Sequence, residues 1–147
     1  MKLKNKFLQQ KKVGIWIDQE KAYIFKIKGE EEPVMEKINS GIELRNRIRG
    51  DKEEVTRFGS FILGEREKKQ RRQRAARAKY YKDITIHIHD ADYCLIFGPG
   101  ETKHELAKTV RKDNTMKEKI SAVENSGRLT LNQMKAKVKD FFTVKEI

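Results

Sequence analysis

Residues 90–106 read DADYCLIFGPGETKHEL, and this stretch decides the fold class. Its centre, residues 93–97 (YCLIF), is a continuous apolar run that is typical of a strand covered on both faces. A Gly-Pro-Gly turn ends the strand, and a helix is expected to follow to about Lys112. A strand at 119–124 and a last helix from about Thr130 complete a βαβα order. The two strands should therefore be parallel and joined by a right-handed crossover.

The last helix has the clearest start in the sequence. Thr130 is the expected N-cap, and Gln133 three residues later completes a capping box. Met134, Val138 and Phe141 form the apolar stripe of this helix and are expected to face the sheet.

The chain before residue 90 predicts antiparallel strands at its N-terminal end. Residues 12–18 (KVGIWID) and 21–28 (KAYIFKIK) are apolar runs joined by a short polar turn, which is typical of a β-hairpin. Residues 34–38 are expected to add a strand, and residues 42–49 alternate between apolar and charged side chains like a half-buried strand. The predicted fold is therefore α/β, with a mixed sheet that has antiparallel N-terminal strands and a parallel βαβα half.

A long helix is expected from about Glu65 to His89, after a loop over residues 50–64. Its second half has an apolar stripe with a spacing of four, formed by Ala76, Tyr80, Ile84 and Ile88. Its first half has eight basic residues, which are Arg66, Lys68, Lys69, Arg71, Arg72, Arg74, Arg77 and Lys79. A helix that is polar all round cannot bury a face. This half, at about residues 65–80, is therefore expected to project from the body as a basic arm, or to order fully only when bound.

The composition is that of a basic, single-domain protein. The chain has 147 residues, a formal net charge of +12 and an isoelectric point of about 9.8. A basic protein usually binds a polyanion, and no apolar run of roughly 18 residues predicts a membrane span. Residues 1–11 lack the apolar centre of a signal peptide and are expected to form a disordered basic tail before one domain at 12–147. The single cysteine, Cys94, should be a buried thiol, which fits a cytoplasmic protein.

The basic arm is the strongest functional signal in the sequence. Lysine and arginine side chains neutralise phosphates and release counterions, which gives salt-sensitive binding with little sequence preference. Solvated helix faces usually mix positive and negative charges, whereas this one hardly does. The arm therefore predicts contact with RNA or DNA. Three arginines of the alternating segment are expected to add to it: Arg45, Arg47 and Arg49.

The turn from Gly98 to Gly100 has two interpretations. It joins a buried strand to a helix N-terminus, where free amide groups are able to hold an anion. Glu101 already places a carboxylate at that end, and Thr102 with Glu105 has the pattern of a capping box. A structural turn is the favoured interpretation, because the GxxxxGK[ST] pattern of a phosphate-binding loop is absent.

The sequence predicts no metal site, no cofactor and no catalytic residue. His87, His89 and Asp90 are close in sequence, but residues two apart on a helix point to different sides. A metal-dependent nuclease or hydrolase acting on RNA stays open as an alternative, and it requires several carboxylates around two metal ions. The candidates are Asp18, Asp92 and Glu124.

A protein-interaction module is the third alternative. Phe58, Phe61 and Leu63 are unusually apolar for the predicted loop over residues 50–64. These side chains either dock on the core of the domain or form a contact surface for a protein partner.

Four segments together resemble a known family. They are KVGIWIDQEKAYIF at 12–25, KYYKDI at 79–84, DADYCLIFGPGETKHEL at 90–106 and NQMKAKVKDFF at 132–142. They resemble small bacterial proteins related to the middle domain of archaeal and eukaryotic class-one peptide release factors and of Pelota, the ribosome rescue factor. The most specific part of the resemblance is LIFGPGETKHEL.

This resemblance implies a ribonuclease H-like topology and a place on the ribosome, along transfer RNA. Release factors of this kind hydrolyse peptidyl-tRNA through a Gly-Gly-Gln triplet in the loop before the long helix. Residues 57–64 read RFGSFILG here, and the sequence contains no Gly-Gly-Gln. Pelota also lacks the triplet. The resemblance therefore implies a non-catalytic protein that binds ribosomal or transfer RNA, in translation rescue, hibernation or a stress response, without the decoding and factor-recruiting domains.

Overall fold

The computed structural model describes residues 10–42 and 59–146, and for 59–63 and 144–146 it describes the backbone only. Strands and helices alternate after the first three strands, as the βαβα order predicts. The elements are β1 (Lys11–Ile17), β2 (Lys21–Lys28), β3 (Val34–Asn39), α3 (Gly59–His87), β4 (Tyr93–Gly98), α4 (Thr102–Arg111), β5 (Ile120–Asn125) and α5 (Leu131–Glu146).

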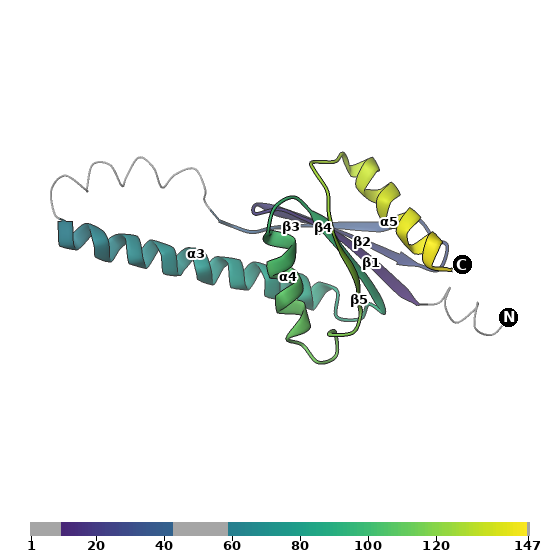
Figure 1. Ribbon diagram of the computed structural model, residues 1–147, viewed down its shortest axis with the longest axis horizontal. Coiled ribbons are helices and arrows are strands. Elements are labelled where there is room, and N and C mark those ends of the chain that lie inside the picture. Colours follow the sequence, from purple (N-terminus) through teal and green to yellow (C-terminus); the bar gives the residue numbers. More distant parts are fainter. Residues whose placement is uncertain (1–9, 43–58, 147) are drawn as a thin grey trace.

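The strands form one mixed sheet in the order β3-β2-β1-β4-β5. The pairs β1–β2 and β2–β3 are antiparallel, whereas β1–β4 and β4–β5 are parallel. This arrangement confirms the predicted fold class, and it is the ribonuclease H-like strand order that the family resemblance implies. The end of α3 and α4 cover one face of the sheet, and α5 covers the other (Figure 1).

Successive residues of the central strand build two apolar layers. Ile15 of β1 points to the face covered by α3 and α4, where it shares a cluster with Ile84 and Leu106. Trp16, the next residue, points to the opposite face and shares a cluster with Val138 of α5. All five side chains have an exposed fraction of 1% or less. Burial on both faces explains why β4, beside β1, is a continuous apolar run.

The close approach of α5 to the sheet depends on a glycine in β1. A Cβ atom at Gly14 would overlap the methyl carbons of Val138. Met134 and Val138 face the sheet as predicted, but the third residue of the stripe is Phe142. Phe141, the predicted third residue, is half-buried and packs against the edge of the same cluster. Spacings of three and of four both keep a residue near one helix face, and the packing of α5 on the sheet selects the spacing of four.

Helix α3 begins earlier than predicted. It runs from Gly59 to His87, so the predicted loop over 50–64 is wrong from residue 59 onward, and the helix ends two residues before the predicted His89. Gly64 in a helix interior costs only about 1 kcal/mol relative to alanine, which does not end a helix that continues on both sides. The earlier residues of the predicted loop lie outside the described part of the chain.

Two further boundaries differ from the predictions or lie outside the description. β1 begins at Lys11, so the predicted tail over 1–11 is one residue too long. Ile42, the first residue of the predicted strand over 42–49, is not in a strand, and the others are not described.

Cys94 of β4 is a buried thiol, as predicted. Burial raises the pKa of the thiol to about 12. Because the thiolate is the reactive form, native protein should react with a thiol reagent at mildly alkaline pH on the order of 100-fold more slowly than denatured protein. The absorbance of thionitrobenzoate released from Ellman's reagent measures both rates. Equal rates in the native and denatured protein would contradict this placement of the thiol.

Candidate nucleic-acid interface

The second half of α3 is anchored in the body. Ile84 is completely buried in the core. Tyr80 Oη donates a hydrogen bond of 3.1 Å to the backbone carbonyl of Asp18, and Tyr81 Oη donates one of 2.7 Å to Oε1 of Glu105. Burial raises the pKa of both tyrosines above the usual range, so both hydroxyls keep their protons and remain donors even in alkaline solution. These contacts fix the direction in which the rest of the helix leaves the body.

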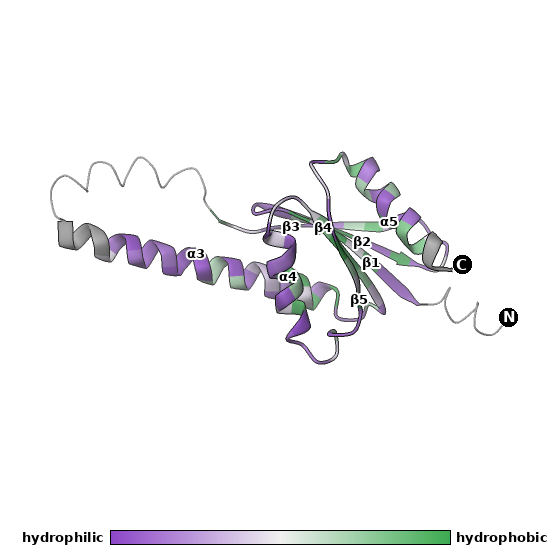
Figure 2. Cartoon of the chain, viewed as in Figure 1, coloured by the Kyte–Doolittle hydropathy of each residue, from purple (hydrophilic) through white to green (hydrophobic). Residues whose placement is uncertain are grey.

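The first half of α3 leaves the body. It extends past the edge of the sheet (Figure 1), and it is hydrophilic along most of this length (Figure 2). From Gly64 to Lys79 no residue is buried, whereas Tyr80, the next residue, is only 2% exposed. In the structure, this half of α3 projects from the body. We call residues 65–79 the arm.

Most cations of the arm have no carboxylate partner in the described part of the chain. The arm has eight basic residues against two acidic ones, Glu65 and Glu67. Lys68 Nζ lies 3.6 Å from Oε1 of Glu65, and this is an exposed pair that contributes little stability. Six basic residues form no ion pair with any described residue. They are Arg66, Arg71, Arg72, Arg74, Arg77 and Lys79.

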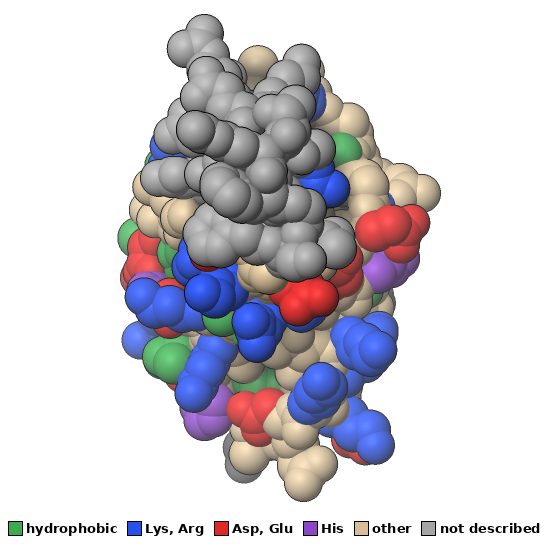
Figure 3. Space-filling model, turned by 90° about the vertical axis from the view of Figure 1, so that its left-hand side faces the viewer, with side chains coloured by type: hydrophobic (Ala, Val, Ile, Leu, Met, Phe, Trp, Pro, Cys, Tyr) green, Lys and Arg blue, Asp and Glu red, His purple; other side chains and the backbone are tan. Residues whose placement is uncertain are grey.

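A second group of cations, which the sequence did not lead us to expect, lies at the C-terminal end of α4. Lys108, Arg111 and Lys112 are exposed, and their spacing of three and four places them side by side at the end of the helix. The hydrogen bond between Tyr81 and Glu105 joins α4 to the anchored half of α3. Figure 3 views the molecule from the end at which α3 projects. Lysine and arginine side chains lie on both the left and the right of this view. The helical spacing of these three cations was the signal that could have found them.

The turn after β4 is held by contacts within the protein. Lys103 is 1% exposed, and its Nζ donates to the backbone carbonyl of Gly100. The amide of Ser126 donates to the carbonyl of Gly98 at 3.1 Å. A cavity of about 250 Å³ adjoins the turn, and its lining has three carboxylates and one guanidinium, from Asp18, Glu20, Glu101 and Arg128. This mainly acidic lining favours the structural interpretation over an anion site.

The predicted capping box at the start of α4 is wrong. Glu101 is the N-cap residue, without a hydrogen bond from its side chain, and Thr102 is buried. Oε1 of Glu105 accepts the hydrogen bond of Tyr81, so a partner distant in sequence takes this carboxylate.

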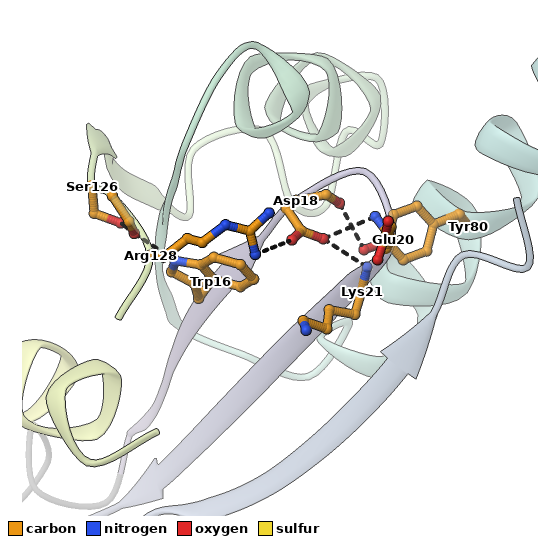
Figure 4. A network of polar contacts seen from close by, with 8 residues as sticks. Trp16, Asp18, Glu20, Lys21, Tyr80, Ser126 and Arg128 are labelled. Atoms are coloured by element: carbon orange, nitrogen blue, oxygen red, sulfur yellow. Dashed lines mark hydrogen bonds and ion pairs between the residues drawn. The ribbon is translucent and has the colours of Figure 1, made fainter. Parts of the chain in front are cut away.

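Asp18 closes the hairpin between β1 and β2, as Figure 4 shows. Its Oδ1 accepts hydrogen bonds of 2.8 Å from the backbone amides of both Glu20 and Lys21. Its Oδ2 lies 3.9 Å from Nη1 of Arg128. These contacts are typical of an aspartate at a turn.

The three carboxylates considered for a nuclease site do not converge. Asp18 follows β1, whereas Asp92 accepts a hydrogen bond of 2.9 Å from the amide of Lys11, at the other end of the same strand. Glu124 of β5 pairs with Lys137 of α5 at 2.9 Å. The described residues contain no group of three or more His, Cys, Asp or Glu side chains with the placement of a metal site. The nuclease alternative therefore gains no support from the placement of these residues.

His87, His89 and Asp90 have separate partners. His87 Nε2 lies 3.8 Å from Oε2 of Glu36 on β3, and His89 Nε2 lies 3.8 Å from Oδ2 of Asp113. Asp90 pairs with a lysine of β1 at 2.7 Å. The three side chains thus point to different neighbours.

Six predicted site residues lie outside the described side chains. They are Arg45, Arg47, Arg49, Phe58, Phe61 and Leu63. Their contribution to binding RNA or a protein partner stays a prediction.

The fold and the arm define a five-stranded mixed α/β domain that carries an exposed basic helix. No protein-family model and no curated protein matches the sequence. Among solved structures, the chain is similar to the archaeal translation termination factor aRF1. The TM-score is 0.51 and the identity 12%, over 92% of this chain and 39% of that chain. The chain thus spans about two fifths of the aRF1 structure, and at this identity the likeness shows the fold alone.

A second solved structure is less similar. It is the PilM-PilN type IV pilus biogenesis complex, with a TM-score of 0.44 and 11% identity over 98% of this chain and 47% of that chain. A likeness at this level carries no functional argument. None of the described helices has the length and the apolar character that a membrane crossing requires.

Proposed function

We propose that this protein binds structured RNA of the translation machinery, either ribosomal or transfer RNA, without hydrolysing it. One observation supports this above all: residues 65–79 leave the body, bury no side chain and have eight basic residues against two acidic ones. Cations without a partner among the described residues are available to phosphates, and each such contact releases counterions into solution.

The composition of the arm favours a nucleic acid over a membrane surface. A helix that lies in a membrane interface needs an apolar face with large side chains. Between Glu65 and Lys79 the only apolar residues are Ala75, Ala76 and Ala78. The arm therefore has the charge for an anionic surface but not the apolar face for insertion into lipid.

The choice of translation RNA rests on two likenesses. The fold is similar to that of aRF1, a translation termination factor. The segment LIFGPGETKHEL, residues 95–106, resembles the corresponding part of release factors and Pelota. On this basis the protein acts on the ribosome or on transfer RNA in the cytoplasm, in rescue, hibernation or a related stress state.

The non-catalytic part of the proposal rests on the residues present. The sequence has no Gly-Gly-Gln triplet for peptidyl-tRNA hydrolysis. The carboxylates Asp18, Asp92 and Glu124 point to separate partners. Binding, rather than bond cleavage, is the role that these residues support.

Sedimentation through a sucrose gradient with ribosomes tests the proposed function. The protein should travel with the ribosomes at low salt and be released at high salt, because phosphate contacts weaken steeply as salt rises. A gradient without ribosomes is the control. Absence from the ribosomal fractions at low salt, together with no binding to transfer RNA, would overturn the proposal. Release of peptide from peptidyl-tRNA would overturn its non-catalytic part.

A further inference from the structure

The cations of the arm lie on several sides of the helix rather than on one face. An α-helix has 3.6 residues per turn, so residues seven, eleven or eighteen apart lie close to one line along the helix. Each line of the arm can therefore be followed into the anchored half of α3, where burial and contacts show which way it points.

One line of cations faces away from the body. It contains Lys68, Arg72 and Lys79. The next residue on this line is Ile86, seven residues after Lys79, and it is 62% exposed. The line therefore points to solvent along the whole helix.

A second line lies on the side that packs against the body. Arg66 and Arg77 align with Ile84, which follows Arg77 by seven residues and is completely buried. In the arm this line is no longer covered, since Arg66 is exposed and Arg77 is half-buried. On this line, basic residues of the arm therefore occupy the positions that core residues occupy in the anchored half.

A third line lies between these two, on the side of α4. Arg74 lies on this line, and Arg71, three residues earlier, is rotated from Arg74 by about 60° toward the first line. Both side chains are exposed. Tyr81 follows Arg74 by seven residues, and its hydroxyl donates to Glu105 of α4. That hydrogen bond shows that the third line points toward α4.

A helix that docks flat on a duplex places only one of these lines against phosphates. Phosphates must lie on at least three sides of the arm if all three lines are to be neutralised. A helix with its side chains is about 10–12 Å across, whereas the major groove of continuous A-form RNA is deep and narrow. The groove of an unbroken RNA duplex is therefore too narrow for the arm.

We propose that the arm inserts into an opening between RNA segments, such as a groove widened by an internal loop or the crevice at a helical junction. This inference rests on the proposed function and names the kind of RNA that the arm recognises. Ala75, Ala76 and Ala78 lie together near the anchored end of the arm and keep the helix thin there. Thin helix segments allow a close approach of RNA backbone on the sides that lack long side chains.

Three matched variants test the insertion. Each replaces two cations of one side of the helix by glutamine, which keeps the helix propensity and removes two charges. The pairs are Arg72 with Lys79, Arg66 with Arg77, and Arg71 with Arg74. Fluorescence anisotropy over a series of salt concentrations gives the affinity for an RNA three-way junction, for a continuous RNA duplex of equal length and for the DNA duplex of that sequence. Circular dichroism shows whether each variant keeps its helix.

Each variant should lower the slope of log affinity against log salt for the junction by roughly 1.4–1.8, which is two phosphate contacts. The junction should bind at least about 10-fold more tightly than either duplex, since the insertion needs an opening. A lower slope for one pair only would mean flat docking, so that insertion fails while RNA binding stands. Tightest binding to DNA, whose major groove accepts a helix, would also overturn insertion. Unchanged slopes for all three pairs would show that the arm does not contact the RNA, and this would also overturn the proposed function.

Discussion

Replacement of Arg71, Arg72 and Arg74 by glutamate is expected to lower the affinity for ribosomal or transfer RNA by about 100-fold at low salt. These three exposed arginines have no ion pair with a described residue, so their loss removes contacts to RNA and leaves no described carboxylate unpaired. The three new carboxylates also repel phosphates. Each lost contact should reduce the slope of log affinity against log salt by roughly 0.7–0.9. Fluorescence anisotropy with labelled transfer RNA at several salt concentrations measures both quantities.

A matched variant separates this effect from that of net charge. Lys28, Lys135 and Lys139 lie away from the arm, at the end of β2 and on α5, and their replacement by glutamate changes the charge by the same amount. The pairs of Lys135 and Lys139 with Glu32 are exposed and contribute little stability. This control should keep most of the affinity and nearly all of the slope. Equal losses in the two variants would show that overall charge, not the arm, determines binding.

Replacement of Gly98 by alanine is expected to have the largest effect on stability. Gly98 ends β4 with a φ of 150°, a conformation that side chains strongly disfavour. A Cβ atom there would also overlap the backbone carbonyl oxygen of Ile17 in the neighbouring strand β1. Because this oxygen belongs to the backbone of the central strand, it has no rotamer by which to move away. The free energy of unfolding should fall by about 3 kcal/mol or more.

The replacement of Gly100 by alanine is the matched control. Gly100 has a φ of 65° and lies in the same turn, but apart from its chain neighbours no described residue comes within 4 Å of the position of a Cβ atom. Only the left-handed backbone opposes a side chain here, which costs about 1–2 kcal/mol. Urea unfolding followed by the fluorescence of Trp16, the single tryptophan, compares the two variants. A smaller loss for Gly98 than for Gly100 would contradict the close approach of β4 and β1.

The sequence predicted the sheet well because its strands carry strong local patterns. The hairpin over residues 12–28 and the apolar run at 93–97 are local signals, and the two crossovers follow from chain connectivity. The stripe of α5 was predicted with Phe141 but not Phe142, which is the more deeply buried of the two, because the register of a helix on a sheet depends on the surface below it. Gly14, which sets how closely α5 approaches, gave no local signal of its own.

The candidate interface was predicted in part, for similar reasons. A helix segment that is polar on all sides has no apolar face to pack on the core. The composition of residues 65–79 was therefore enough to predict that they project. The role of Glu105 was mistaken, because its partner Tyr81 is distant in sequence. The cations around Lys108 belong to a helix of mixed charge, and the pairing of Asp113 with His89 places the end of that helix near the end of α3 rather than beside the arm.

The continuity of α3 has a mechanical consequence. The helix is 29 residues long, roughly 44 Å, and no break separates the arm from the half that is anchored by Tyr80 and Tyr81. The arm is therefore rigidly joined to the body at the end of the sheet. A partner bound to the arm sets the orientation of the whole domain. A rotation of the helix by a few degrees at its anchored end moves the tip of the arm by a few ångströms.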